Sequence, residues 1–290
     1  MRTVDKNSVT SAVKATFECK NARVEFLLSK LVEAVHDYAR DVSLTHEEWN
    51  EMISFLTRAG EITDKERNEF VLLSDVLGLS SLVDMINSPE GATESSVLGP
   101  FHILGAPELA IGGDLIGDNP GDPVVVYGDV RNAEGKPIEG ARLEIWQTAD
   151  NGLYSNQDDN QSAFNLRCRQ VTDANGKYGF STVRPAPYTV PSDGPVGSFL
   201  EATGRHPWRP SHLHFIVMAD GYRDLVTELF PEDDPYLDED AVFGVRKSLI
   251  LRYQKLDDPT SLPLKFAAAD RLGTSFSAVH FDFTLVPDTR

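Results

Sequence analysis

The first ninety residues carry a hydrophobic pattern with the period of an α-helix. Between residues 21 and 42, apolar side chains recur at three- and four-residue steps: Val24, Leu27, Leu28, Leu31, Val35 and Tyr38. This spacing places them on one stripe of an amphipathic helix. The pattern therefore predicts a long helix with one apolar side.

Further helices are expected before residue 90. Thr45 and Glu48 have the spacing of a capping box, so a second helix should begin there. It is expected to end at Gly60, because glycine suits the left-handed position that closes many helices. A third helical run should stop near Gly78, and a short helix is expected over residues 80–86.

From about residue 120 the hydrophobic period changes to two, which is typical of β-strands. Strands are expected at Val124–Val130, Ala141–Gln147, His212–Met218 and Val279–Leu285. Residues 132–137 have turn chemistry, and Asp173-Ala-Asn-Gly176 is typical of a β-hairpin. Helices followed by strands predict an α+β fold, with a helical N-terminal domain (1–95) and a mainly antiparallel β-sandwich (96–290).

Composition and charge restrict the function. The chain has 45 acidic against 27 basic residues, a net charge of −18, which repels phosphate backbones and anionic lipid. Nucleic acid and membrane surfaces are therefore not expected as partners. We see no apolar signal-peptide core or transmembrane run, and Cys19 and Cys168 are too few for a disulfide framework. These features predict a cytoplasmic protein.

The sharpest local signal is the run from Ser211 to Phe215. Side chains two residues apart share one face of a strand, so His212 and His214 would point the same way, about 6–7 Å apart along the strand. Leu213 and Phe215 would then face the core. Two such imidazoles can bind one metal ion, but a His-x-His pair alone does not distinguish a metal site from two histidines without a ligand.

Two tyrosines stand in unusual loops, Tyr154 within residues 151–156 and Tyr188 within residues 184–191. No cysteine lies near the histidine pair, and its flanking segments supply few carboxylates. Two phenolate oxygens with two neutral imidazoles suit Fe(III), a hard cation, better than Zn(II) or Cu(I). A single tyrosine is more often a packed aromatic, however, and spacing does not select these two from the eight tyrosines present.

Several short motifs together resemble the intradiol ring-cleaving dioxygenases, in order, from about residue 20 to 285. They are Leu98-Gly-Pro-Phe101, Ile145-Trp-Gln147, Gly152-Leu-Tyr154, Arg184-Pro-Ala-Pro-Tyr188 and Gly204-Arg-His-Pro-Trp-Arg-Pro-Ser-His-Leu-His214. Asp193-Gly-Pro-Val-Gly197, the run from Leu200 to Trp208, and Asp240-Ala-Val-Phe-Gly-Val245 are most similar to the branch that cleaves hydroxyquinol.

The resemblance implies a site and an activity. Tyr154, Tyr188, His212 and His214 match the family's ligands to one Fe(III) per subunit, with Tyr188 and His214 axial. Tyr188 would also accept a substrate proton, and Arg209 would stabilise negative charge on the substrate. The implied reaction is ring opening of a small aromatic diol by O₂. For hydroxyquinol the product would be 3-hydroxymuconate, which tautomerises to maleylacetate.

The family's substrate pocket also maps onto this chain. Its residues here are Leu72, Asp75, Val97, Gly99, Pro100, Phe101, Val190, Pro191, Arg209 and Val242. Asp75 stands out because a carboxylate among apolar side chains is costly unless it is paired. A third ring hydroxyl would pair with it, which favours a trihydroxybenzene; a solvated Asp75 at a helix edge is the alternative.

One position departs from the pattern, and two other functions stay open. Glu228 stands where catechol-cleaving relatives carry glutamine, and it could pair with Arg209 and partly neutralise it. Catechol or a chlorocatechol is the alternative substrate. A non-catalytic transthyretin-like binding module is the alternative from another class.

The resemblance further implies a homodimer built on the N-terminal helices, whose interface can enclose a lipid-like molecule.

Overall fold

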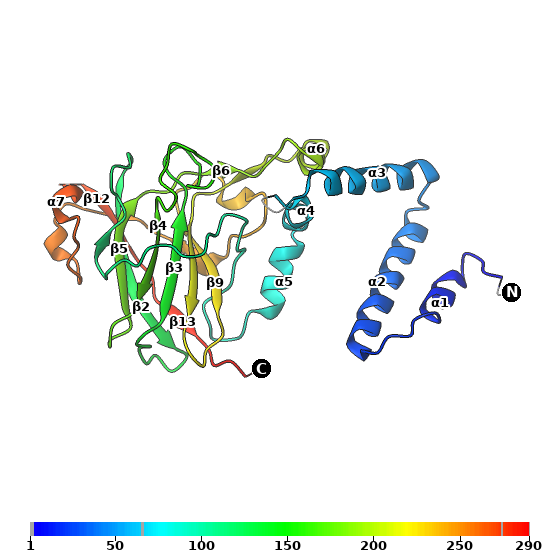
Figure 1. Ribbon diagram of the computed structural model, residues 1–290, viewed down its shortest axis with the longest axis horizontal. Coiled ribbons are helices and arrows are strands. Elements are labelled where there is room, and N and C mark those ends of the chain that lie inside the picture. The colour runs from blue at the N-terminus through cyan, green and yellow to red at the C-terminus, as the bar shows by residue number, and fades with distance from the viewer. Residues whose placement is uncertain (1–2, 65–66, 274, 290) are drawn as a thin grey trace. The chain divides into compact units, whose positions relative to one another are not determined.

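The computed structural model describes residues 3–64, 67–273 and 275–289. It contains two compact units, the first ending at Arg58 and the second beginning at Ala59 (Figure 1). The first unit is helical and the second contains both large sheets. An α+β chain with N-terminal helices and a sheet-containing remainder is therefore confirmed, whereas the domain boundary expected after residue 95 stays a prediction.

The first unit holds α1 (Val9–Lys14), α2 (Ala22–Asp41) and most of α3 (His46–Ile62). The side chain of Asn21 caps α2 by accepting hydrogen bonds from the backbone N–H groups of Arg23 (2.8 Å) and Val24 (3.3 Å). The long amphipathic helix is thus confirmed. None of its 20 residues is buried, so its apolar stripe lies exposed.

The start of α3 follows the prediction, and its end does not. Thr45 Oγ1 accepts from the Glu48 N–H (3.2 Å), and the Glu48 carboxylate accepts from the Thr45 N–H (2.9 Å), as a capping box requires. The expected end at Gly60 is wrong, because α3 continues past it. The hydroxyl of Thr63 donates to the Ala59 carbonyl (2.7 Å), so one carbonyl of the last turn is satisfied without a left-handed residue.

The other helices belong to the second unit. They are α4 (Glu69–Val76), α5 (Leu79–Asn87), α6 (Pro195–Ala202) and α7 (Ala269–Leu272), with 3₁₀ turns η1 (Leu237–Glu239), η2 (Lys247–Leu249) and η3 (Pro259–Ser261). Gly78, with φ 71°, separates α4 from α5 as expected. No helix in the described ranges is both long enough and apolar enough to cross a membrane.

Two sheets build the second unit. The larger has the order β1 (Gly113–Asp114), β5 (Lys177–Val183), β2 (Pro123–Asn132), β12 (Phe276–His280) and β11 (Gln254–Leu256), and β13 (Phe283–Leu285) also pairs with β2. The smaller has the order β10 (Ile250–Leu251), β9 (Leu225–Pro231), β8 (Leu213–Met218), β3 (Arg142–Gln147) and β4 (Arg167–Val171). A separate pair joins β6 (Tyr188–Thr189) to β7 (Trp208–Arg209).

The two large sheets pack face to face. Val126 and Phe180 from one sheet lie in the same buried cluster as Leu143, Phe215 and Leu229 from the other. The central neighbours β2/β5, β3/β8 and β8/β9 are antiparallel, whereas β12 and β13 run parallel to β2. The expected sandwich is therefore present, with mixed rather than uniform strand directions.

Two local expectations in the sheets are wrong. Residues 173–176 do form a turn, in which Asp173 Oδ1 accepts from the Lys177 N–H (2.9 Å), but β4 and β5 on either side pair in different sheets. The turn therefore crosses between the sheets instead of closing a hairpin. The single strand expected over residues 279–285 is interrupted, and its two parts, β12 and β13, both pair with β2.

Candidate metal centre and substrate cavity

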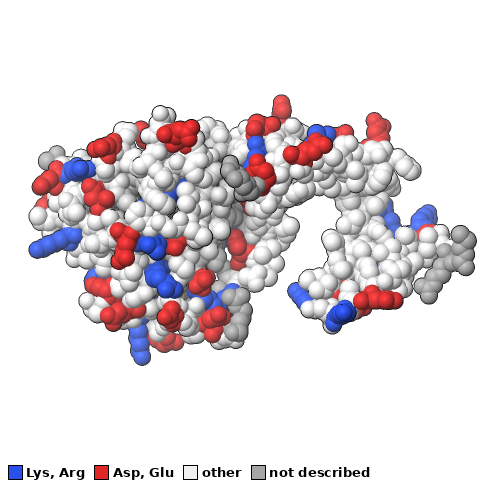
Figure 2. Space-filling view, in the orientation of Figure 1, with Lys and Arg blue, Asp and Glu red and all other residues white. Residues whose placement is uncertain are grey.

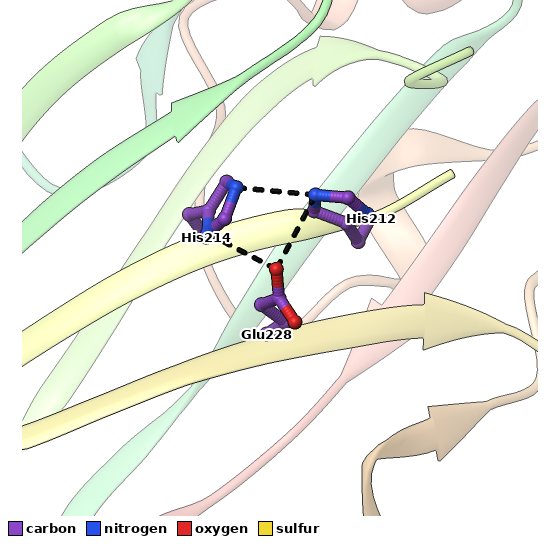
Figure 3. Close-up of side chains that lie close together, drawn as sticks. All are labelled: His212, His214 and Glu228. Carbon is purple, nitrogen blue, oxygen red and sulfur yellow. Dashed lines mark hydrogen bonds and ion pairs between the residues drawn. The ribbon is translucent and has the colours of Figure 1, made fainter. Parts of the chain in front are cut away.

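The histidine pair lies at the start of β8. Leu213 and Phe215 are fully buried in the sandwich core, so His212 and His214 point to the opposite face, as the period of two predicted. Their Nε2 atoms lie 3.1 Å apart (Figure 3). Both rings are almost completely buried.

Tyr154 approaches the same point from the loop after β3. Its Oη lies 3.2 Å from His212 Nε2 and 3.0 Å from His214 Nε2. The turn before it needs glycine, because Gly152 has φ 77° and a Cβ there would lie 3.1 Å from the Pro187 carbonyl oxygen. The sequence-predicted Tyr154 thus joins both histidines at one buried point.

Tyr188 comes from the β6/β7 pair, where it lies directly opposite Arg209. Its ring meets that of Tyr154 edge-on, with centroids 5.4 Å apart, and lies 5.6 Å from the ring of His212. Its Oη is 3.5 Å from Arg209 Nη1. The four predicted ligands therefore gather from three separate segments of the chain.

The donor atoms suit a cation. Burial raises the pKa of Tyr154 and of Tyr188, and burial lowers the pKa of His212 and of His214. Imidazoles that stay neutral keep a lone pair available for a metal, and a bound cation would offset the cost of ionising buried phenols. Two oxygen and two nitrogen donors with no cysteine fit iron, which accepts this mixture of hard and intermediate ligands.

A carboxylate that sequence reasoning did not place beside the histidines lies next to them. Glu228, on β9, is fully buried, and its Oε1 is 3.4 Å from both His212 Nε2 and His214 Nδ1 (Figure 3). The sequence expectation covered only the segments that flank the histidines, whereas strand pairing brings Glu228 opposite His214 from β9. Glu228 approaches His214 from the Nδ1 side, away from the Nε2 atom that faces Tyr154.

Arg209 is held by two carboxylates. Its Nη1 and Nη2 donate to Glu228 (2.8 and 2.9 Å), as the sequence suggested, and its Nε donates to Asp240 (3.0 Å). Although burial acts to raise it, Arg209 keeps the pKa of Glu228 below its usual value. Gly244 leaves room for this cluster, since a Cβ there would lie 2.7 Å from Arg209 Nη2. Sequence reasoning missed this role of Asp240, although Asp240 begins one of the motifs that resemble the family.

A cavity of about 860 Å³ lies entirely within the second unit and has Arg209 in its lining. All ten residues expected in the substrate pocket line it: Leu72, Asp75, Val97, Gly99, Pro100, Phe101, Val190, Pro191, Arg209 and Val242. Tyr188 lines it as well. Burial raises the pKa of the Asp75 carboxyl, which faces a mainly apolar space. Arg67 and Asp84, which also line the cavity, were not anticipated from the sequence.

Comparisons with known proteins give one consistent answer. A family model described as "Dioxygenase" matches residues 106–287, and one described as "Catechol dioxygenase N terminus" matches residues 21–94. The hydroxyquinol 1,2-dioxygenase of Rhizobium sp. (strain MTP-10005) is 42% identical over 258 residues, covering 88% of each chain. The 6-chlorohydroxyquinol 1,2-dioxygenase of Cupriavidus pinatubonensis is 45% identical over 263 residues, covering 90% of this chain and 95% of that one.

Solved structures agree with the sequence comparisons. The hydroxyquinol 1,2-dioxygenase from Pseudomonas putida DLL-E4 matches with a TM-score of 0.90 and 42% identity, over 98% of this chain and 99% of that one. The catechol 1,2-dioxygenase from Acinetobacter radioresistens matches with a TM-score of 0.81 and 30% identity, over 100% of this chain and 96% of that one. Both the helical N-terminal part and the sandwich are thus shared with these enzymes.

Proposed function

This chain belongs to the intradiol ring-cleaving dioxygenase family, whose members use non-haem iron, O₂ and an aromatic diol, and on that premise we propose that it opens the ring of hydroxyquinol (1,2,4-trihydroxybenzene). The observation that carries the proposal is one cavity lined by Tyr188, Arg209 and, from α4, Asp75. The relatives at 42% and 45% identity that act on hydroxyquinols point to the same substrate. The product would be 3-hydroxymuconate, which tautomerises to maleylacetate.

The metal would be Fe(III), one per subunit, held by Tyr154, Tyr188, His212 and His214. The three contacts of 3.0–3.2 Å among Tyr154 Oη and the two Nε2 atoms support this set. Glu228 is not included, because both of its oxygens already accept hydrogen bonds from Arg209. The trivalent state is favoured by the phenol donors, whose ionised form pairs best with a hard, highly charged cation.

The mechanism assigns a task to each side chain. Iron, when bound, would draw electron density from the diol and so make a ring carbon reactive toward O₂. The diol would lose two protons on binding: Tyr188 Oη, ionised while it holds the metal, would accept one, and the solvent hydroxide that the diol displaces would take the other. Arg209 Nη1, 3.5 Å from that oxygen, stabilises the negative charge that develops beside it. The apolar walls at Val97, Val190 and Val242 exclude competing water.

Asp75 would select the third hydroxyl. Its carboxyl lines the cavity from α4, which is far in the sequence from the four ligand positions. The hydroxyl at ring position 4 is the group that hydroxyquinol has and catechol lacks. A hydrogen bond to a charged partner contributes about 1.5–3 kcal/mol. Catechol or a chlorocatechol is the alternative substrate, and it would leave Asp75 without that partner. A non-catalytic binding module does not account for the family relationship.

The exposed stripe on α2 supports a homodimer. Its large apolar side chains are 39–58% exposed: Val24, Phe26, Leu27, Leu28, Leu31, Val35 and Tyr38. Charged side chains are sparse over most of the face of this helix that Figure 2 shows. A second copy of the chain would cover this stripe, and a lipid-like molecule enclosed between the copies is part of the same proposal. A cytoplasmic location is proposed with it.

The visible absorption spectrum of the purified, iron-loaded protein tests the function. Tyrosinate-to-Fe(III) charge transfer should colour the protein wine-red, and hydroxyquinol added without O₂ should shift the band to longer wavelength. Turnover should then be fastest on hydroxyquinol, and Asp75→Asn should lower it about 10- to 100-fold there while sparing catechol. A protein that stays colourless after reconstitution with iron would contradict the ligand set; faster turnover of catechol would contradict the substrate.

A further inference from the structure

Glu228 is a buried carboxylate whose position opposite the histidines has no role in the scheme above. It lies on β9, directly across from His214 on β8, and its side chain is completely buried. Figure 3 shows its carboxylate directed at the edges of both imidazoles. A buried charge is tolerated only when several partners stabilise it, so each of its contacts matters.

The two oxygens of Glu228 have different surroundings. Oε2 accepts from Ser96 Oγ (2.7 Å) and from Arg209 Nη2 (2.9 Å). Oε1 accepts from Arg209 Nη1 (2.8 Å) and lies 3.4 Å from both His212 Nε2 and His214 Nδ1. Only Oε1 therefore faces the histidine pair.

The guanidinium of Arg209 is shared between two carboxylates. Arg209 also donates to Asp240 through Nε (3.0 Å), so one guanidinium stands against two carboxylates. Arg209, Glu228 and Asp240 together therefore keep a net negative charge. The atom of this group that faces the histidines is Oε1 of Glu228. An N–H donor on His214 Nδ1 would be stabilised there.

His214 has such a donor position. Its Nδ1 is buried and makes no hydrogen bond within the described part of the chain, and Glu228 Oε1 is the charged atom beside it. Its Nε2 faces Tyr154 Oη and His212 Nε2. The ring is stacked flat on Trp146 (centroids 4.6 Å apart, planes at 6°), which fixes its plane. An imidazole that binds a cation through Nε2 carries its proton on Nδ1.

We propose that Glu228 is a positioning residue for the metal site: it accepts the Nδ1–H of His214, fixes that ring as a donor through Nε2, and strengthens it as a ligand. The proposal rests on the metal site of the proposed function. Carboxylates in this position hold the tautomer and orientation of a ligating histidine and raise its basicity. A glutamine at this position could not both hold Arg209 and accept from His214, because one end of its amide would place an N–H against a donor of Arg209 or His214.

Two matched variants separate this role from an effect on Arg209. Glu228→Gln and Asp240→Asn each remove one carboxylate from the same guanidinium, but only the first lies at His214. Glu228→Gln should bind iron about 10- to 100-fold more weakly and shift the tyrosinate charge-transfer band to longer wavelength. Asp240→Asn should leave iron affinity and band position close to those of the wild type. Equal losses in both variants, or no change in Glu228→Gln, would overturn the proposal.

A measurement on the unmodified chain decides the matter even if a variant does not fold. In protein loaded with diamagnetic Ga(III) and labelled with ¹⁵N-histidine, two exchange-protected Nδ1–H signals are expected from the histidines of the site. One comes from His212, whose Nδ1 lies 2.7 Å from the Pro210 carbonyl oxygen, and the other from His214. A single protected signal would overturn the role of Glu228. A wild-type protein that binds neither metal would instead overturn the proposed function itself.

Discussion

Tyr154, Tyr188, His212 and His214 are ionisable side chains that the fold removes almost completely from water. Burial disfavours their charged forms, which raises the pKa of both phenols and lowers the pKa of both imidazoles. Aromatic rings pack against them, and Phe101, for example, stacks on Tyr154 with centroids 4.6 Å apart. Arg209 and Glu228 are charged groups beside them. At the scale of single residues, the site is therefore arranged to keep neutral donors ready for a cation.

Asp75 gives a prediction about stability and pH at the same scale. Burial raises the pKa of its carboxyl in the folded chain, so folding binds its proton more tightly than the unfolded chain does. The stabilisation is complete below the unfolded pKa and is lost as the pH rises through the folded pKa. Asp75→Asn cannot ionise, so it should melt at a higher temperature than the wild type at pH 7.

The pH profile of melting provides the control for that prediction. The difference in melting temperature between Asp75→Asn and the wild type should shrink steadily as the pH is lowered below the folded pKa, because the wild-type carboxyl then becomes neutral too. Scanning calorimetry of both proteins from pH 4 upwards measures it, at about unit steps of pH. A difference that stays constant across the range, or a variant that is less stable at pH 7, would contradict a raised pKa for Asp75.

At the scale of elements, strand β2 explains why the chain beside it is interrupted between β12 and β13. β12 ends opposite Tyr127 and β13 begins opposite Val130, so the interruption lies beside Gly128. A Cβ on Gly128 would lie 1.7 Å from the carbonyl oxygen of Phe281. The Asp282 carboxylate accepts from the Asp129 N–H (2.9 Å) and continues the pairing across the gap. The close backbone approach requires glycine in the middle of a strand.

Gly128→Ala should therefore destabilise the second unit. The new methyl group has no space unless β2 or the β12/β13 connection moves, and a cost of at least about 2 kcal/mol is expected. Gly60→Ala is the matched control, because Gly60 lies within α3 and the nearest atom to an added Cβ is Phe70 Cζ at 4.0 Å. That substitution should be neutral or slightly stabilising, since alanine favours a helix. Urea unfolding of both variants distinguishes the two signs; similar midpoints would refute the packing argument.

At the scale of the whole molecule, charge and exposed apolar surface act in different ways. The net charge of −18 opposes association through surfaces of like sign. The α2 stripe favours association, because a helix of 20 residues with no buried side chain leaves an extended apolar surface in water. Any self-association should therefore depend on this helix.

Leu31→Glu should convert the proposed dimer to a monomer. Leu31 is 58% exposed and central in the stripe, and a buried, unpaired carboxylate at an apolar interface is strongly unfavourable. Lys30→Glu is the control, since it adds negative charge to the same helix at the neighbouring, polar position. Sedimentation velocity should give a monomer for Leu31→Glu and a dimer for Lys30→Glu. A wild-type protein that sediments as a monomer would contradict the dimer itself.

The sequence by itself determined whatever depends on neighbouring residues. The amphipathic pattern and Asn21 define α2, and the period of two puts His212 and His214 on one face of their strand. The ordered motifs identified the family, and through it every residue of the expected cavity lining. These features are readable because helix caps, turns and strand alternation are set within a few residues along the chain.

Only the tertiary structure decided the contacts between distant segments. The turn at residues 173–176 crosses between two sheets, and Glu228 meets His214 because β8 and β9 pair in one register. Asp240 reaches Arg209 across 31 positions of the sequence. No local pattern encodes such pairings, because they depend on which apolar faces pack together once the sandwich has formed, and that packing brings each buried charge to its partners.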